Sequence, residues 1–130
     1  MNAPSEDIKD MLEAVSSLGL TFGTDLFIAF EPDNPDECVT LFDTTGRQPA
    51  LSMDGSTYER PSLQVRVRSN SYENGWDLIE NIKNSLHGRA QESWNGTLYS
   101  IIYTASGPAM LDYDEQSRVR FIVNFDMQRR

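Results

Sequence analysis

The stretch from Leu63 to Leu86 constrains the fold more than any other part of the sequence. Leu63, Val65 and Val67 alternate with polar residues, which is the period of a strand with one buried face. Shortly afterwards, from Tyr72 to Leu86, apolar residues recur at helical spacing. A strand that leads directly into an amphipathic helix predicts a domain in which the helix covers one face of a sheet.

Further elements are predicted on both sides of this unit. Apolar residues at helical spacing predict a first helix from Ser5, as N-cap, to Leu18, with Gly19 as its stop. The stretch 26–43 is interpreted as a hairpin with an acidic tip. We therefore expect one α/β domain of the α+β kind over residues 1–130. Its sheet is expected to be mixed and mostly antiparallel, with about five strands and with two helices packed on one face. The strands expected are 26–30, 38–43, 63–68, 97–105 and 118–127.

Residues 44–60 show no clean period. A connection of this length exceeds the usual range inside a small domain, so it is expected to be either functional or disordered. Leu51, Met53 and Tyr58 give it apolar content. This content favours a partner-binding loop over a plain linker.

Composition limits the classes of function. The chain has 130 residues, a net charge of −9 and a single cysteine, Cys38. Its length fits one domain that folds without a disulfide or a metal. It shows no signal peptide and no apolar run long enough to cross a membrane, so we expect a soluble protein made in a cytoplasm. The acidic excess, concentrated in residues 1–60, argues against nonspecific binding to nucleic acid.

Candidates for catalysis are few. His87 is the only histidine and falls at the predicted end of a helix, where a histidine is favourable without any catalytic role. Cys38 follows an acidic run that would raise the pKa of its thiol. The acidic clusters at 33–37 and 112–115 do not match a calcium-binding loop and are typical of solvated turns. We expect no enzymatic activity, no metal and no cofactor.

Arginines give the most distinctive surface. Arg66 and Arg68 share one strand face, as do Arg118 and Arg120, so four guanidinium groups would gather opposite the core if the two strands are close. This is either an ordinary polar face or a surface between subunits, where it would meet the acidic cluster of a neighbour. The residues predicted at subunit or partner interfaces are Arg66, Arg68, Arg118, Arg120, Asp112, Asp114, Glu115, Leu51, Met53 and Tyr58.

Several of these motifs together resemble one family. The sequence resembles the tail terminator and minor capsid proteins of long-tailed bacteriophages in four segments. These are the strand 63–69, the helix that opens at 72–76 and ends with Leu-His-Gly at 86–88, the acidic turn 112–115 and the strand 118–125. The similarity spans roughly residues 26–127. It implies an α/β subunit that forms a hexameric ring at the head-proximal end of the tail. Such a ring would stop polymerisation of the tail tube and join the tail to the head.

The resemblance also implies a set of partners. These are other copies of the chain, the tail tube protein and the head–tail connector or stopper protein, with no membrane involved. The protein would be assembled in the host cytoplasm and reside in the virion. DNA would pass through the lumen of the ring without specific binding, and an acidic lumen would help because like charges repel at short range.

Two other classes of function stay open. One is a small monomeric inhibitor or binding module whose acidic half blocks a basic partner. The other is an enzyme that uses the acidic clusters with a metal, in which case divalent ions would stabilise the fold. Self-assembly separates the ring protein from the monomeric module.

Overall fold

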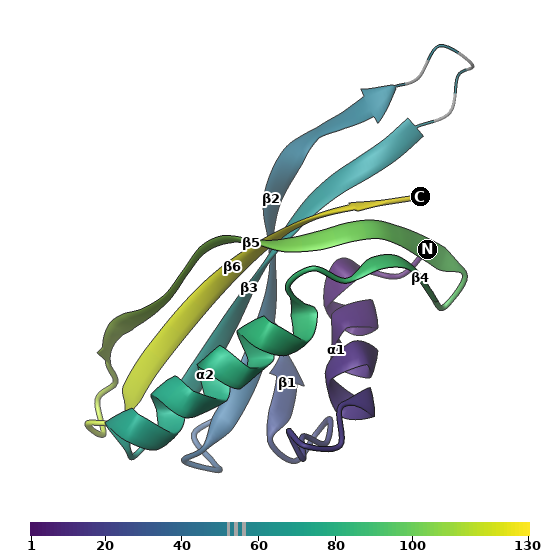
Figure 1. The fold of residues 1–130 in the computed structure, drawn as a ribbon. Helices are drawn as coiled ribbons and strands as arrows, with labels where there is room; N and C mark the ends of the chain where they lie inside the picture. Colours follow the sequence, from purple (N-terminus) through teal and green to yellow (C-terminus); the bar gives the residue numbers. More distant parts are fainter. Residues whose placement is uncertain (52, 54, 56) are drawn as a thin grey trace.

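The structure, a computed structural model, describes residues 1–51, 53, 55 and 57–130. Its centre is one six-stranded sheet in the order β1-β2-β3-β6-β5-β4, accompanied by two helices (Figure 1). β1 and β2 are parallel, and every other neighbouring pair is antiparallel. The elements are α1 Pro4–Ala14, β1 Leu26–Ile28, β2 Cys38–Leu51, β3 Thr57–Ser69, α2 Tyr72–Leu86, β4 Ala90–Trp94, β5 Thr97–Tyr113 and β6 Val119–Arg129.

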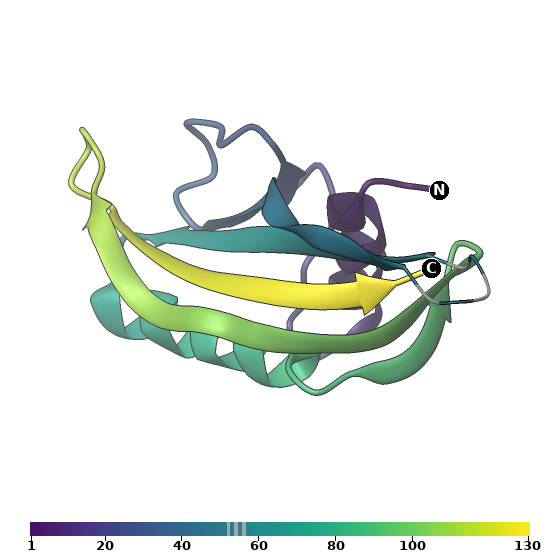
Figure 2. The ribbon, with the colours of Figure 1, turned by 90° about the horizontal axis from the view of Figure 1, so that it is seen from above.

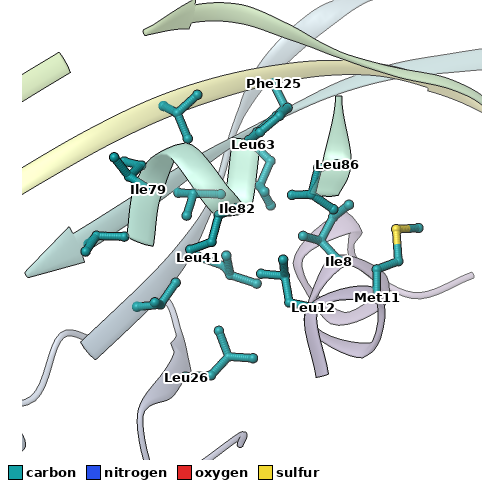
Figure 3. Close-up of a cluster of buried hydrophobic side chains, with 14 of the residues drawn as sticks. Ile8, Met11, Leu12, Leu26, Leu41, Leu63, Ile79, Ile82, Leu86 and Phe125 are labelled. Atoms are coloured by element: carbon teal, nitrogen blue, oxygen red, sulfur yellow. The ribbon is translucent and has the colours of Figure 1, made fainter. Parts of the chain in front are cut away.

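The core lies between the sheet and the two helices. Buried residues of α1 and α2 meet residues of β1, β2 and β3 there, as Ile8, Ile82 and Leu41 illustrate (Figure 3). β6 alternates buried and half-buried residues along its whole length, so one side of the strand faces the helices and the other faces away. The predicted α+β class with both helices on one face is confirmed, with six strands instead of five.

Helix α2 has the bounds that its sequence predicts. Ser71 is its N-cap, and the Ser71 hydroxyl accepts the Asn74 N–H at 3.2 Å. Gly75 is needed within the helix because a Cβ added there would lie 2.7 Å from Cε2 of Phe121. Phe121 of β6 therefore packs directly against the helix backbone.

Helix α1 is shorter than predicted. It ends at Ala14, four residues before Leu18, and its N-cap position is held by Ala3, which makes no side-chain cap. Ser5 lies in the first turn, where its N–H and hydroxyl both donate to the Asp43 carboxylate on β2, at 3.0 and 2.7 Å. The expected cap at Ser5 is wrong because this residue anchors the helix to the sheet.

The predicted hairpin over 26–43 is also wrong. β1 pairs with β2 in parallel, with Leu26 opposite Val39, so the chain has to return before β2 begins. The connecting segment, residues 29–37, is named here the β1–β2 loop. It lies over the helix-free face of the sheet, on the side opposite α2 (Figure 2). The acidic tip is therefore folded back onto the sheet.

Most of the predicted 44–60 loop is strand. β2 continues to Leu51 and β3 begins at Thr57, so the two strands pair well beyond Thr44 and Ser62. Two register shifts, between Thr44 and Arg47 and between Arg47 and Ala50, break the period-2 pattern that would have revealed the strand. Residues 52, 54 and 56 of this predicted loop lie outside the described residues.

The sixth strand, β4, is missing from the prediction. It forms a hairpin with β5 around Asn95 and Gly96, whose φ angles of 52° and 82° suit a tight hairpin turn. β5 itself runs past Pro108 to Tyr113, further than predicted, because a proline is tolerated at a sheet edge. β3 and β5 flank β6 and are parallel to each other, so the chain crosses over from β3 to β5 through α2.

Candidate interaction surface on the helix-free face

The predicted arginines gather on the face of the sheet away from the helices. β3 and β6 are direct neighbours, with Arg68 opposite Arg120, and Arg118 immediately precedes β6. Arg68 and Arg118 are only 2% and 3% exposed, so two of these four charges are buried. A buried guanidinium has to be fully paired, so the partners of Arg68 and Arg118 determine how this surface is built.

Those partners lie mainly in the β1–β2 loop. Arg68 donates to the backbone carbonyls of Pro35 and Asp36, at 2.6 and 3.3 Å, and Arg118 donates to the carbonyl of Asp33 at 2.5 Å. Arginine suits this role because its planar fork can donate to several oxygens at once. The two side chains therefore hold the loop down on the sheet.

Glu31 joins the remaining arginines to this arrangement. Its carboxylate contacts Arg68 at 3.1 Å, Arg120 at 3.0 Å and Arg66 at 3.6 Å. Arg120 also pairs with Asp112 at 3.2 Å. All four arginines thus have acidic or carbonyl partners in their own chain. A role for them at a contact with a neighbouring subunit stays a prediction.

Asp114 closes the turn between β5 and β6. It accepts the backbone N–H groups of Gln116 and Arg118, at 3.0 and 2.8 Å, and pairs with the Arg118 guanidinium at 2.7 Å. Burial alone would raise the pKa of Asp114. The hydrogen bonds from Arg118 and Gln116 outweigh burial, so the pKa is held below its ordinary value of 3.8.

This lowered pKa predicts a loss of stability in acid. The stabilisation is fully present above pH 3.8 and is lost as pH falls through the lower pKa of the folded state. We expect the free energy of unfolding to drop below about pH 4 and to drop less steeply in the Asp114→Asn variant. Urea denaturation from pH 7 to pH 2.5 measures both. Equal acid slopes in the two proteins would contradict the assignment.

A cavity of about 450 Å³ lies beside these ion pairs. Its lining combines the arginines with Glu31, Asp33, Tyr113 and Glu115. Because positive and negative side chains share the lining, it carries no strong excess of either sign. The predicted residues Asp112, Asp114 and Glu115 thus lie next to the arginines, as one continuous charged surface.

The other predicted interface residues lie at the opposite end of the sheet. Leu51 and Met53 are exposed in the β2–β3 hairpin, and Tyr58 is half-buried beneath the Arg130 guanidinium, 4.9 Å from the ring centre. Figure 1 shows this hairpin projecting away from the β5–β6 turn. The structure therefore separates the predicted site into a charged surface and an apolar hairpin end.

One buried polar cluster is absent from the sequence interpretation. Asp7 of α1 is fully buried and accepts hydrogen bonds from Tyr99 at 2.5 Å and Asn95 at 2.7 Å. Arg129 of β6 donates to the Tyr99 hydroxyl at 3.2 Å. Burial, together with the hydrogen bond to Asp7, raises the pKa of Tyr99. The cluster joins both chain ends, and no local pattern of sequence could have revealed it.

His87 and Cys38, the residues considered for catalysis, are part of the packing and hydrogen bonding of the fold. Nδ1 of His87 accepts the backbone N–H of Thr104 at 2.9 Å, so this ring caps a strand edge. Cys38 is buried, and burial raises the pKa of its thiol. Within the described ranges, no group of three or more His, Cys, Asp or Glu side chains is placed to hold a metal. No helix there is long and apolar enough to cross a membrane.

The fold and its surfaces thus define a small α+β domain whose distinctive features are ion-paired and apolar surfaces. The family model described as "Bacteriophage tail terminator protein" matches residues 14–130, and the chain belongs to this family. The family consists of structural proteins, and the chain is a structural component of the virion tail.

A solved structure has the same fold. It is a chain of the virion of a native gene transfer agent particle, with a TM-score of 0.74. The two chains are 14% identical, and the match covers 97% of this chain and 93% of the other. No curated protein sequence matches the chain significantly.

Proposed function

We propose that copies of the chain form a closed hexameric ring at the head-proximal end of the tail. The ring ends polymerisation of the tail tube and joins the tail to the head connector. The observation that carries this proposal is the family match over residues 14–130. The chain then acts without catalysis, and its partners are its own copies, the tail tube protein and the connector or stopper protein.

The surfaces of the molecule suit this assembly. The charged surface and the apolar hairpin end lie at opposite ends of the sheet, so one subunit can contact different neighbours at each end. Leu51 and Met53 are exposed apolar residues of the kind that become buried at interfaces. The ring assembles in the host cytoplasm, and DNA passes through its lumen without base-specific contacts.

Particles lacking this chain test the proposal directly. In cells that produce the virion with this gene deleted, we expect tails of uncontrolled length that are not joined to heads. Electron microscopy of negatively stained lysates measures both features. Supplying the intact chain in trans should restore joined tails of uniform length. Normal joined tails in the deletion strain would contradict the proposal.

A further inference from the structure

The sheet has an open edge along the second half of β2. On the side away from β3, β1 covers only Val39 to Leu41, and Asp43 receives the start of α1. Residues 44–51 have no strand beside them there among the described residues. Their only charge is Arg47, which contacts Asp126 at 3.6 Å within the same sheet.

A second open edge runs along the second half of β5. β4 and its flanking residues cover β5 up to Ile102. From 103 to 113, the side of β5 away from β6 has no strand beside it in the described part of the chain. This stretch contains one charged residue, Asp112, and its exposed side chains include Leu111, 40% exposed, and Tyr113, 59% exposed. Pro108 and three register shifts interrupt this edge, but it carries no lysine, the charge that commonly protects a strand edge from pairing.

The two edges complement each other in direction. β2, β3, β6 and β5 alternate in direction, so β2 and β5 are opposite. Rotation about a ring axis preserves each strand's direction relative to that axis. β2 of the next copy would therefore lie antiparallel to β5, the same relation that most neighbouring strands have within the sheet. The contact uses different surfaces of the two copies, as a closed ring requires.

The offset between the edges also fits a ring. Thr44 and Tyr103 lie in one row across the sheet, because Ser62 and Asp126 connect them. From this row the two open edges extend in opposite directions along the strands. Overlap requires a shift of roughly five to seven residues, or ~16–23 Å at the usual rise. Four strands span ~19 Å, so the shift corresponds to a strand tilt of ~40–50°, and its smaller values agree with the ~35–45° tilt of closed sheets.

The geometry points to a specific contact: residues 44–51 of one copy add to residues 103–113 of the next as an antiparallel strand. This inference rests on the proposed ring and names the surfaces that close it. The sheets of successive copies then become continuous. Leu111 and Tyr113, exposed in a single copy, come to lie at the contact.

Lysines placed on each edge test this contact, because a charge at a strand edge blocks pairing. We expect Leu111→Lys and Gln48→Lys each to raise the concentration at which the chain assembles by at least about tenfold. Asn81→Lys adds the same positive charge on the exposed side of α2 and should assemble like the native chain. Light scattering over a concentration series gives the assembly midpoint, and circular dichroism verifies that each variant is folded.

Hydrogen exchange on the native chain tests it without substitutions. Amides in 44–51 and 103–113 should exchange more slowly in the assembled state than in the monomer. An assembled chain with no added protection at these edges would overturn the inference and leave the ring itself standing. A chain that forms only dimers, and whose assembly is weakened by Leu111→Lys but not by Gln48→Lys, would have two β5 edges paired with each other. That result would also overturn the proposed contact between β2 and β5. A chain that is monomeric at every concentration, with and without preassembled tail tubes, would contradict both the contact and the ring.

Discussion

Replacement of Phe121 by alanine should lower the free energy of unfolding by ~3–5 kcal/mol. Phe121 is fully buried, and its ring contacts Tyr72 and Trp76 edge-on, with centres 5.0 and 5.8 Å apart. It also fills the space that Gly75 leaves open on α2. Removal of the ring therefore leaves a cavity between α2 and β6.

Urea denaturation at neutral pH measures this loss. Phe121→Leu is the matched control, because leucine refills most of the space and should cost about 1–2 kcal/mol. Gly75→Ala should also destabilise, by about 1–3 kcal/mol, since its Cβ would meet the same ring. If Phe121→Ala were as stable as Phe121→Leu, the helix would not be held by this contact.

Replacement of Arg118 by alanine should lower the free energy of unfolding by about 2–3 kcal/mol. Arg118 is buried, and its loss leaves Asp114 without its ion pair and the Asp33 carbonyl without a donor. The β1–β2 loop loses one of the two buried arginines that donate to its backbone carbonyls. Arg118→Lys should restore little of the loss, because an ammonium cannot form the same fork.

The partly exposed Arg120 supplies the control for this change. It pairs with Glu31 and Asp112 at the rim of the same surface, where solvent weakens ion pairs. Arg120→Ala should therefore cost about 1 kcal/mol or less. Hydrogen exchange of residues 29–37 gives a second readout, since the loop should open in Arg118→Ala and stay closed in Arg120→Ala. Equal effects of the two variants would contradict the special role of Arg118.

Local patterns predicted the elements whose signals are uninterrupted. The apolar spacing from Tyr72 to Leu86 gave the bounds of α2, and the alternation in β3 and β6 gave their buried faces. Patterns failed where the backbone departs from regularity. Bulges near Arg47 interrupt the alternating pattern in the second half of β2, so that half was not predicted as strand. Pro108 is typical of a strand end, so the continuation of β5 was not predicted either.

Long-range pairing limited what could be predicted of the candidate surface. The sequence placed Arg66, Arg68, Arg118 and Arg120 on one face correctly, because strand alternation determines it. It could not show that the β1–β2 loop folds back to pair with them, since that depends on the parallel pairing of β1 and β2. The Asp7–Tyr99–Arg129 cluster depends in the same way on contacts between distant parts of the chain.

The solution mass of the purified chain decides whether the proposed ring forms. Light scattering should be recorded over a concentration series at low and moderate salt. We expect a closed species of about six times the 14.7 kDa mass of one chain, or a monomer that converts to it as concentration rises. A strict monomer under every condition, including after addition of preassembled tail tubes, would contradict the ring.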